Sequence, residues 1–408
     1  MDNFLTEIEN NIEWLTSFGK DPKGGITRLL YTDSWLDAQK SLKERFEELG
    51  MNTYFDDIGN LFGRVEGTEL SDETIMTGSH VDTVVNGGMF DGQLGILGGM
   101  MAVQNLIKKH GKPKRSIEVI SMAEEEGSRF PYVFWGSKNI FGLADEEEMK
   151  DVEDSEGKNF VEEMKRCGFD FNKDNTARED IKAFVELHIE QGNTLEIEEK
   201  SIGVVTDIAG QRRYEVELKG EANHAGTTLM KYRKDTVEAF SRIVSESLRK
   251  AKEEGDPLVL TFGHVEPKPN TVNVVPGETI FSIDCRHTNM ETLKNFTEDM
   301  EKTMENIADE MGIDIEINRW MDAPPVPMDD KVISIVENAC KNQDLNYKVM
   351  HSGAGHDAQI FGPRVPTGML FVPSIKGISH NPAEKTETKD LAQGIRALEA
   401  TLYELAYK

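Results

Sequence analysis

The order of strand-like and helix-like segments changes near residue 210 and changes back near residue 325, and this double change constrains the fold more than any other feature. Before it, buried strands alternate with helices, as in the strands 73–79 and 116–122 on either side of the helix 92–108. Such alternation predicts a mainly parallel sheet with helices on both faces.

Between the two changes, six segments follow the order β-α-β-β-α-β, which is the ferredoxin-like arrangement. These segments are 212–219, 235–254, 258–265, 278–287, 290–311 and 313–318. The chain has 408 residues, which is long for a single hydrophobic core. We therefore predict a discontinuous α/β domain, residues 1–209 and 325–408, interrupted by an inserted α+β domain, residues 210–324.

The charge balance excludes some classes of partner. With 46 basic and 74 acidic residues, the formal net charge is −28. Nucleic acids and anionic membranes require a basic surface, so neither is an expected partner. The three cysteines, Cys167, Cys285 and Cys340, are too widely spaced for a disulfide framework. Together with an acidic N-terminus and no apolar run of membrane-spanning length, they predict a cytoplasmic protein.

Histidine and carboxylate residues follow several of the predicted strands. His80 and Asp82 stand two residues apart in the sequence GSHVD, so their side chains point to the same side of an extended segment. A carboxylate at that distance can orient an imidazole, an arrangement common beside metal ions. By themselves, the two residues are equally compatible with a structural role.

Further carboxylates lie where α/β sheets bind ligands. Asp91 precedes the helix 92–108 and fits either a helix N-cap or a metal ligand. Glu124, Glu125 and Glu126 directly follow an apolar strand, at the edge where such sheets bind ligands. Their repulsion would raise one pKa unless a cation neutralised it.

Two further histidines complete this pattern. His188 ends another predicted strand, and His380 lies on a loop before the last helix. Mixed histidine and carboxylate ligands suit zinc, manganese or cobalt rather than calcium or magnesium.

This pattern resembles one family over essentially the whole chain, the M20-type dinuclear metallohydrolases. The matching residues, in order, are His80, Asp82, Asp91, Glu125, Glu126, Gly127, His188 and His380. The motifs HIEQG (188–192), NHAGT (223–227) and GAGHD (353–357) are similar to the branch that cleaves ureido compounds. That branch comprises N-carbamoyl amino-acid hydrolases, β-ureidopropionases and allantoate amidohydrolases, and three longer segments resemble the last group most: 128–142, 267–276 and 350–361.

The resemblance implies two divalent ions per subunit, Mn²⁺ or Zn²⁺. Asp91 would bridge them, and the other metal ligands would be His80, Glu126, His188 and His380. Glu125 would be the general base and Asp82 would orient the site. Two cations lower the pKa of a water molecule and stabilise a tetrahedral oxyanion, while a nearby carboxylate moves the proton.

The resemblance also implies a substrate pocket shared between the two domains. Arg286 lies on an alternating strand of the insert, where its guanidinium could clamp a carboxylate; the alternative is an ion pair with Asp284. The other substrate-binding residues would be Gln191, His224, Asn273, Gly355 and His356. His224 would also stabilise the oxyanion, and the insert would act as a lid and as the contact of a homodimer.

The implied reaction is hydrolysis of allantoate to ureidoglycine, ammonia and carbon dioxide, a step of purine nitrogen catabolism. An N-carbamoyl-L-amino-acid hydrolase or a β-ureidopropionase would share every metal ligand, so both remain alternatives. A non-catalytic metal-dependent binding protein on the same fold is an alternative of another class. Glu125 argues against it, because a binding protein needs no general base at that position.

Overall fold

The computed structural model describes residues 2–22, 24–171 and 177–408, and the chain divides into two compact units. Unit 1 comprises the chain up to Thr206 together with Pro327–Lys408, and unit 2 is Asp207–Val326. The expected range 1–209 includes positions 1, 23 and 172–176, which lie outside the described residues.

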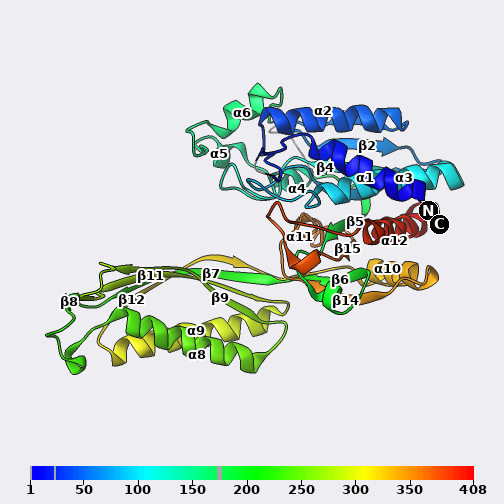
Figure 1. Cartoon of the computed structure of the whole chain (residues 1–408). Coiled ribbons are helices and arrows are strands. Elements are labelled where there is room, and N and C mark those ends of the chain that lie inside the picture. Colours follow the sequence, from blue (N-terminus) through cyan, green and yellow to red (C-terminus); the bar gives the residue numbers. More distant parts are fainter. Residues whose placement is uncertain (1, 23, 172–176) are drawn as a thin grey trace. The chain divides into compact units, whose positions relative to one another are not determined.

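Unit 1 is built on a nine-stranded sheet with the strand order β1-β2-β4-β3-β5-β15-β6-β13, in which β14 also pairs with β6 (Figure 1). The strands are β1 Asn52–Phe55, β2 Leu61–Val65, β3 Leu70–His80, β4 Arg115–Met122, β5 Ile181–Ile189, β6 Ile202–Ile208, β13 Val326–Pro327, β14 Tyr347–Ser352 and β15 Thr367–Val372.

The sheet is mixed, so the expectation of a mainly parallel sheet holds only for its centre. The neighbours β4, β3, β5 and β15 run parallel, whereas β1, β2 and β6 pair antiparallel. Only residues 56–60 join β1 to β2, which is too short for a parallel crossover. Asp56 Oδ1 accepts the backbone N–H groups of Ile58, Gly59 and Asn60 at 3.2, 3.0 and 2.8 Å, and so shapes this tight turn.

Helices cover both faces of the sheet. Leu187 and Phe184 of β5 differ by an odd number of positions, so their side chains point to opposite faces. A Cβ on Gly98 of α3 or on Gly394 of α12 would lie 2.8 or 3.0 Å from Leu187 side-chain atoms, so both helices pack closely on that face. On the other face, the ring of Phe361 in α11 stacks on Phe184 with a centroid distance of 3.9 Å.

The helices of unit 1 have the following bounds: α1 Asp2–Thr16, α2 Asp33–Glu48, α3 Gln93–His110, α4 Trp135–Ile140, α5 Glu146–Met149, α6 Phe160–Arg166, α7 Thr194–Ile197, α10 Asp330–Asn342, α11 Ala358–Phe361, η2 Ile375–Gly377 and α12 Thr388–Tyr407. The predicted helix 92–108 is confirmed as α3 to within two residues.

Unit 2 contains a four-stranded antiparallel sheet with the order β12-β7-β11-β9, and the helices α8 and α9 pack on one face of it (Figure 1). The elements are β7 Gly210–Lys219, β8 Asn223–His224, η1 Met230–Tyr232, α8 Thr236–Glu254, β9 Val259–Lys268, β10 Val274–Val275, β11 Glu278–His287, α9 Met290–Glu310 and β12 Asp314–Ala323. The alternation predicted for 212–219 is visible in β7, where Tyr214, Val216 and Leu218 are buried.

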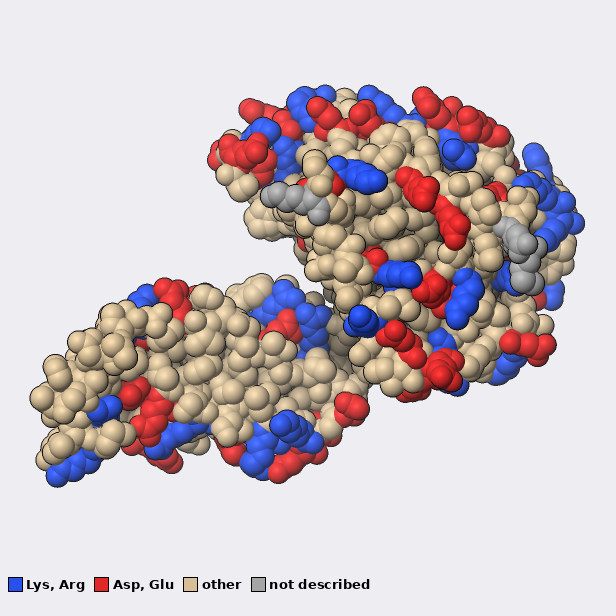
Figure 2. Space-filling view, in the orientation of Figure 1, with Lys and Arg blue, Asp and Glu red and all other residues tan. Residues whose placement is uncertain are grey.

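Acidic and basic side chains are interspersed over the visible face of both units (Figure 2). Among the described residues, no helix combines the length and apolar content needed to cross a bilayer.

Candidate metal centre

A group of histidine and carboxylate side chains of unit 1 gathers at the carboxyl ends of neighbouring parallel strands. His80 is the last residue of β3, and His188 is the next-to-last residue of β5. Glu125 and Glu126 lie three and four residues after the end of β4, and Asp91 comes from the loop before α3. The carboxyl ends of parallel strands meet at one edge of the sheet, which is why residues distant in sequence converge there.

Asp91 lies at the middle of this group and is 6% exposed. Its Oδ1 is 3.2 Å from His188 Nε2 and 3.6 Å from His80 Nε2, whereas its Oδ2 is 3.2 Å from His380 Nε2. Glu126 Oε1 is in turn 3.4 Å from His380 Nε2. The two oxygens of Asp91 therefore face two different sets of ligand atoms, which is the geometry of a bridging carboxylate.

The two sets are His80–Asp91–His188 and Asp91–Glu126–His380, and within each set the ligand atoms lie within 4.8 Å of one another. All five predicted metal ligands thus come together. Nitrogen and carboxylate oxygen donors of this kind fit a pair of divalent transition-metal ions.

Hydrogen bonds at Nδ1 of His188 and His80 determine that Nε2 is the ring nitrogen that faces the metal centre. His188 Nδ1 is 2.9 Å from the carbonyl oxygen of Ile189, and His80 Nδ1 is 3.1 Å from that of Asp82. A carbonyl oxygen only accepts hydrogen bonds, so each Nδ1 carries a proton. When the ring is neutral, each Nε2 therefore carries a lone pair that can bind a cation, although the Nε2 of His188 also accepts the Gly92 N–H at 3.3 Å.

Protonation states in the metal-free chain show how strongly the site attracts positive charge. Hydrogen bonds to Asp91 and Glu126 raise the pKa of His380 to about 10. Burial alone would lower the pKa of His80, but Asp82 and Asp91 outweigh it and raise that pKa well above its usual value. Bound cations would take the place of these protons.

Glu125 is held beside the ligand atoms without being part of either set around Asp91. Its backbone N–H donates to Asp82 Oδ1 at 3.0 Å, and that of Glu126 donates to Asp82 Oδ2 at 3.2 Å. Its carboxylate lies within 4.8 Å of ligand atoms of His80 and Glu126. Burial, followed by the charge of Glu126, raises the pKa of Glu125 well above its usual value, so the group binds a proton readily.

Glu124, the first of the three consecutive glutamates, has a structural role. Its carboxylate accepts the backbone N–H groups of Gly127 and Trp135, so it shapes the loop that follows β4.

Gly92 provides space that the sequence did not reveal. The N-cap of α3 is Gly92, with no side-chain cap, so the N-cap interpretation of Asp91 is wrong. Gly92 has φ +66°, and a Cβ on it would lie 2.4–2.6 Å from three atoms of the His80 ring. Because Gly92 takes the N-cap position, the Asp91 carboxylate does not cap the helix and faces the metal ligands instead.

Gln191 and the loop after β14 border the centre. Gln191 Nε2 donates to Asp91 Oδ2 at 2.9 Å, and its Oε1 is buried with no hydrogen-bond partner. The ring of His356, which follows Gly355, lies 4.5 Å from the ring of His188. Burial and the neighbouring His188 lower the pKa of His356 well below its usual value, so this ring is neutral. Because Gln191 Oε1 has no hydrogen-bond partner, it can accept an N–H group of a ligand.

His224, Asn273 and Arg286 belong to unit 2. The short strands β8 and β10 bring the first two together, because Ala225 N–H donates to the Asn273 carbonyl oxygen at 3.0 Å. Both side chains are exposed. His224 Nδ1 accepts the Gly226 N–H at 3.0 Å, which leaves Nε2–H as an outward donor in the neutral ring.

The ion pair weighed as an alternative for Arg286 is present. Its Nε and Nη2 donate to the two carboxylate oxygens of Asp284 at 2.8 and 2.9 Å.

Ser379 and Glu384 were not identified from the sequence. Ser379 Oγ lies 3.2 Å from Asp91 Oδ2 and 2.9 Å from Glu384 Oε2. Burial, and then the charge of Asp91, raises the pKa of Glu384 to about 7. The available signal was the position of both residues on the loop that carries His380.

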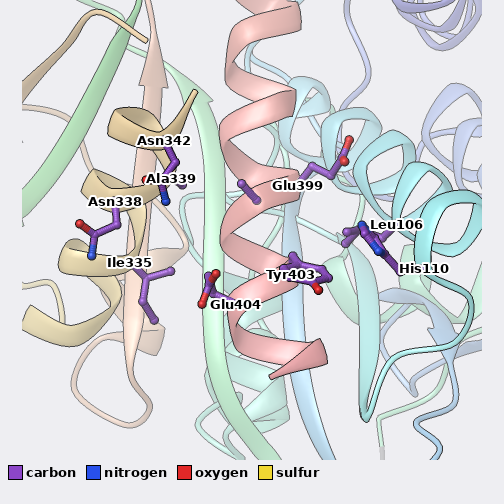
Figure 3. Close-up of a pocket in the computed structure, with 10 residues that line it drawn as sticks. Leu106, His110, Ile335, Asn338, Ala339, Asn342, Glu399, Tyr403 and Glu404 are labelled. Carbon is purple, nitrogen blue, oxygen red and sulfur yellow. The ribbon is translucent and has the colours of Figure 1, made fainter. Parts of the chain in front are cut away.

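A separate pocket of about 430 Å³ lies between the C-terminal half of α3, α10 and α12 (Figure 3). Its lining includes Leu106, His110 and Tyr403. At a rise of about 1.5 Å per residue, the length of α3 separates it from Asp91 by roughly 25 Å. This pocket is therefore not part of the metal centre.

The chain is similar to known proteins over its whole length. It is 58% identical over 407 residues to an allantoate amidohydrolase of Escherichia coli (strain K12), covering 100% of this chain and 99% of the relative. It is 47% identical over 401 residues to an allantoate amidohydrolase of Bacillus subtilis (strain 168), covering 98% and 97%.

Among solved structures, an amidase of the hydantoinase/carbamoylase family from Burkholderia multivorans matches with a TM-score of 0.94 and 32% identity, covering 99% of this chain and 98% of that one. The model of peptidase family M20/M25/M40 matches residues 76–404, a range that contains every ligand of the metal centre. The chain therefore belongs to peptidase family M20/M25/M40.

Proposed function

We propose that this protein is a metal-dependent amidohydrolase that converts allantoate and water to ureidoglycine, ammonia and carbon dioxide. The observation that carries the proposal is Asp91, whose two oxygens face separate ligand sets beside the half-buried carboxylate of Glu125. Similarity over the full chain to two allantoate amidohydrolases supports this choice of substrate.

The metal centre would hold two divalent ions, Mn²⁺ or Zn²⁺, on the five ligands described above. When bound, such ions lower the pKa of water and stabilise the negative charge that develops on the substrate carbonyl oxygen. Glu125 would accept the proton of the attacking water on a carboxylate oxygen and pass it to the departing amine nitrogen. Asp82 would hold Glu125 in place through the backbone N–H of that residue.

Substrate recognition would require groups from both units. In unit 1, Gln191 and His356 lie beside metal ligands, and together with Gly355, which precedes His356, they would contact a ureido arm. In unit 2, Arg286 would exchange part of its pairing with Asp284 for the substrate carboxylate.

His224 would donate Nε2–H to the oxyanion, and Asn273 beside it would complete the pocket. The inserted unit would thus act as a lid. We also propose that it forms the contact of a homodimer and that the enzyme acts in the cytoplasm.

Steady-state kinetics with the Mn²⁺-loaded protein test the choice of substrate. We expect a higher kcat/KM for allantoate than for N-carbamoyl-alanine or β-ureidopropionate. A higher value for either carbamoyl compound would overturn allantoate as substrate while leaving the metal centre intact. The absence of hydrolysis of all three compounds by fully loaded protein would instead favour a non-catalytic binding protein.

A further inference from the structure

Glu384 is a buried carboxylate that joins the loop of Asp91 to the loop of His380, two of the three residues in the set Asp91–Glu126–His380. It lies between η2 and α12 and is 4% exposed. Its Oε1 accepts the backbone N–H groups of Phe90 and Asp91 at 2.8 and 3.1 Å. Its Oε2 accepts the hydroxyl of Ser379 at 2.9 Å, and Ser379 directly precedes His380. One side chain is therefore bonded to the neighbourhood of both Asp91 and His380.

The loop before α3 is built to receive this carboxylate. A Cβ on Gly88 would lie 2.1 Å from Cδ and Oε1 of Glu384, so only glycine leaves the necessary space. Hydrogen bonds from N–H groups to a buried carboxylate are roughly twice as strong as those between neutral groups. Glu384 therefore helps to fix the backbone conformation of the loop that carries Asp91.

The Ser379 hydroxyl links Glu384 to the side chain of Asp91. The oxygen of Ser379 is 3.2 Å from Asp91 Oδ2 and 3.4 Å from Gln191 Nε2. A hydroxyl has a single proton, so Ser379 donates to one carboxylate at a time. With its proton on the closer Glu384, Ser379 leaves a lone pair of Asp91 Oδ2 to a cation, beside the Gln191 N–H that this oxygen also accepts.

Glu384 is not itself in a ligand set. Within residues 2–22, 24–171 and 177–408, the groups of His, Cys, Asp and Glu atoms close enough to share an ion do not include it. Its oxygens are instead directed at two backbone N–H groups and a hydroxyl.

We propose that Glu384 is a positioning residue that aims Asp91 and His380 at a shared cation. This inference rests on the proposed two-cation hydrolase and adds a residue outside the ligand set on which cation affinity depends. Groups that orient metal ligands in this way typically contribute 10–100-fold to metal affinity.

The test is titration of the metal-free, full-length protein with Mn²⁺ by calorimetry, together with the visible absorption spectrum of the Co²⁺ form. Glu384→Ala removes all three hydrogen bonds. Glu384→Asp keeps the charge but is one methylene too short to reach both loops. In both variants we expect the affinity of the cation shared by Asp91, Glu126 and His380 to fall at least tenfold, with an altered Co²⁺ spectrum.

Glu384→Gln retains an oxygen that accepts the two backbone N–H groups but places an N–H donor against Ser379, whose proton then turns to Asp91 Oδ2, so we expect its affinity to fall between those of the parent and Glu384→Ala. Glu387→Ala is a matched control on the same loop, because the Glu387 side chain is 46% exposed and forms an ion pair with Lys385. The melting temperature of each metal-free variant distinguishes weaker metal binding from loss of the fold.

Parent-like affinity for both cations in folded Glu384→Ala or Glu384→Asp would overturn the positioning role. A parent protein that binds fewer than two cations would instead overturn the proposed function, so the two failures are distinguishable.

Discussion

Gly92→Ala tests whether the metal centre depends on empty space beside His80. The added Cβ would lie 2.4 Å from Cε1, 2.5 Å from Nδ1 and 2.6 Å from Nε2 of the His80 ring. Carbon atoms in ordinary contact are about 3.5–4.0 Å apart, so the ring has to retreat by roughly 1 Å. Metal–ligand distances tolerate only about 0.2 Å.

The expected result is selective damage to one cation position. Disturbing the orientation of a ligand typically costs 10–100-fold in affinity, which corresponds to about 1.4–2.7 kcal/mol. The cation held by His80, Asp91 and His188 should therefore bind 10–100-fold more weakly. The one held by Glu126 and His380 should change less, because the three atoms nearest to the added Cβ all belong to His80.

Gly111→Ala is the matched control for the backbone effect. Gly111 lies at the other end of α3 with φ +75°, and a Cβ there has nothing within 4 Å. Both variants strain the backbone by about 1–3 kcal/mol, so both should melt at a lower temperature. Mn²⁺ titration of the metal-free proteins should show weaker binding for Gly92→Ala alone. Equal affinities for Gly92→Ala and the parent would refute the steric argument.

Two other predictions concern the proton chemistry of the centre. Glu125→Gln should retain two cations, because Glu125 is outside both sets around Asp91, but lower kcat on allantoate by about 10²–10⁴-fold, the usual contribution of a general base. Separately, Mn²⁺ binding to the metal-free chain at pH 7 should release protons, because the pKa of His380 is raised to about 10 by Asp91 and Glu126. The proton must leave before Nε2 can bind a cation, so apparent affinity should rise with pH up to about 10, as calorimetry in buffers of different ionisation enthalpy would measure.

Metal analysis provides the contrast for the first of these predictions. Glu126→Gln alters a ligand and should lose the cation it shares with His380, whereas Glu125→Gln should not. Undiminished turnover in Glu125→Gln would remove that residue as the base. Affinity for Mn²⁺ that is independent of pH would contradict the proton displacement.

Much of the fold could be predicted because its signals are local. The apolar helix α3 and the alternating strand β7 appear within two residues of their predicted bounds. The antiparallel margin of the large sheet was not predicted, because strand direction depends on loop length and pairing rather than on periodicity. The short turn at 56–60 decides it for β1 and β2.

In the candidate site, too, residues with a local sequence signal were predicted and residues that act through tertiary contacts were not. His80, Asp82 and Glu125 were found because polar residues that end an apolar strand are conspicuous in the sequence. Gly92 and Glu384 were missed, since their contributions depend on contacts across 12 and 293 positions of the chain, to His80 and Asp91 respectively.

The sequence by itself determined that histidine nitrogens and carboxylate oxygens are the available metal ligands and which strands they follow. It also determined that an α/β pattern is interrupted by a β-α-β-β-α-β pattern. Only the tertiary structure decided that each oxygen of Asp91 faces its own ligand set, that Arg286 pairs with Asp284, and that Glu384 supports the loop of Asp91. The physical reason is that residue type and periodicity act over a few neighbouring residues, whereas a metal centre depends on distances of a few ångströms between segments far apart in the chain.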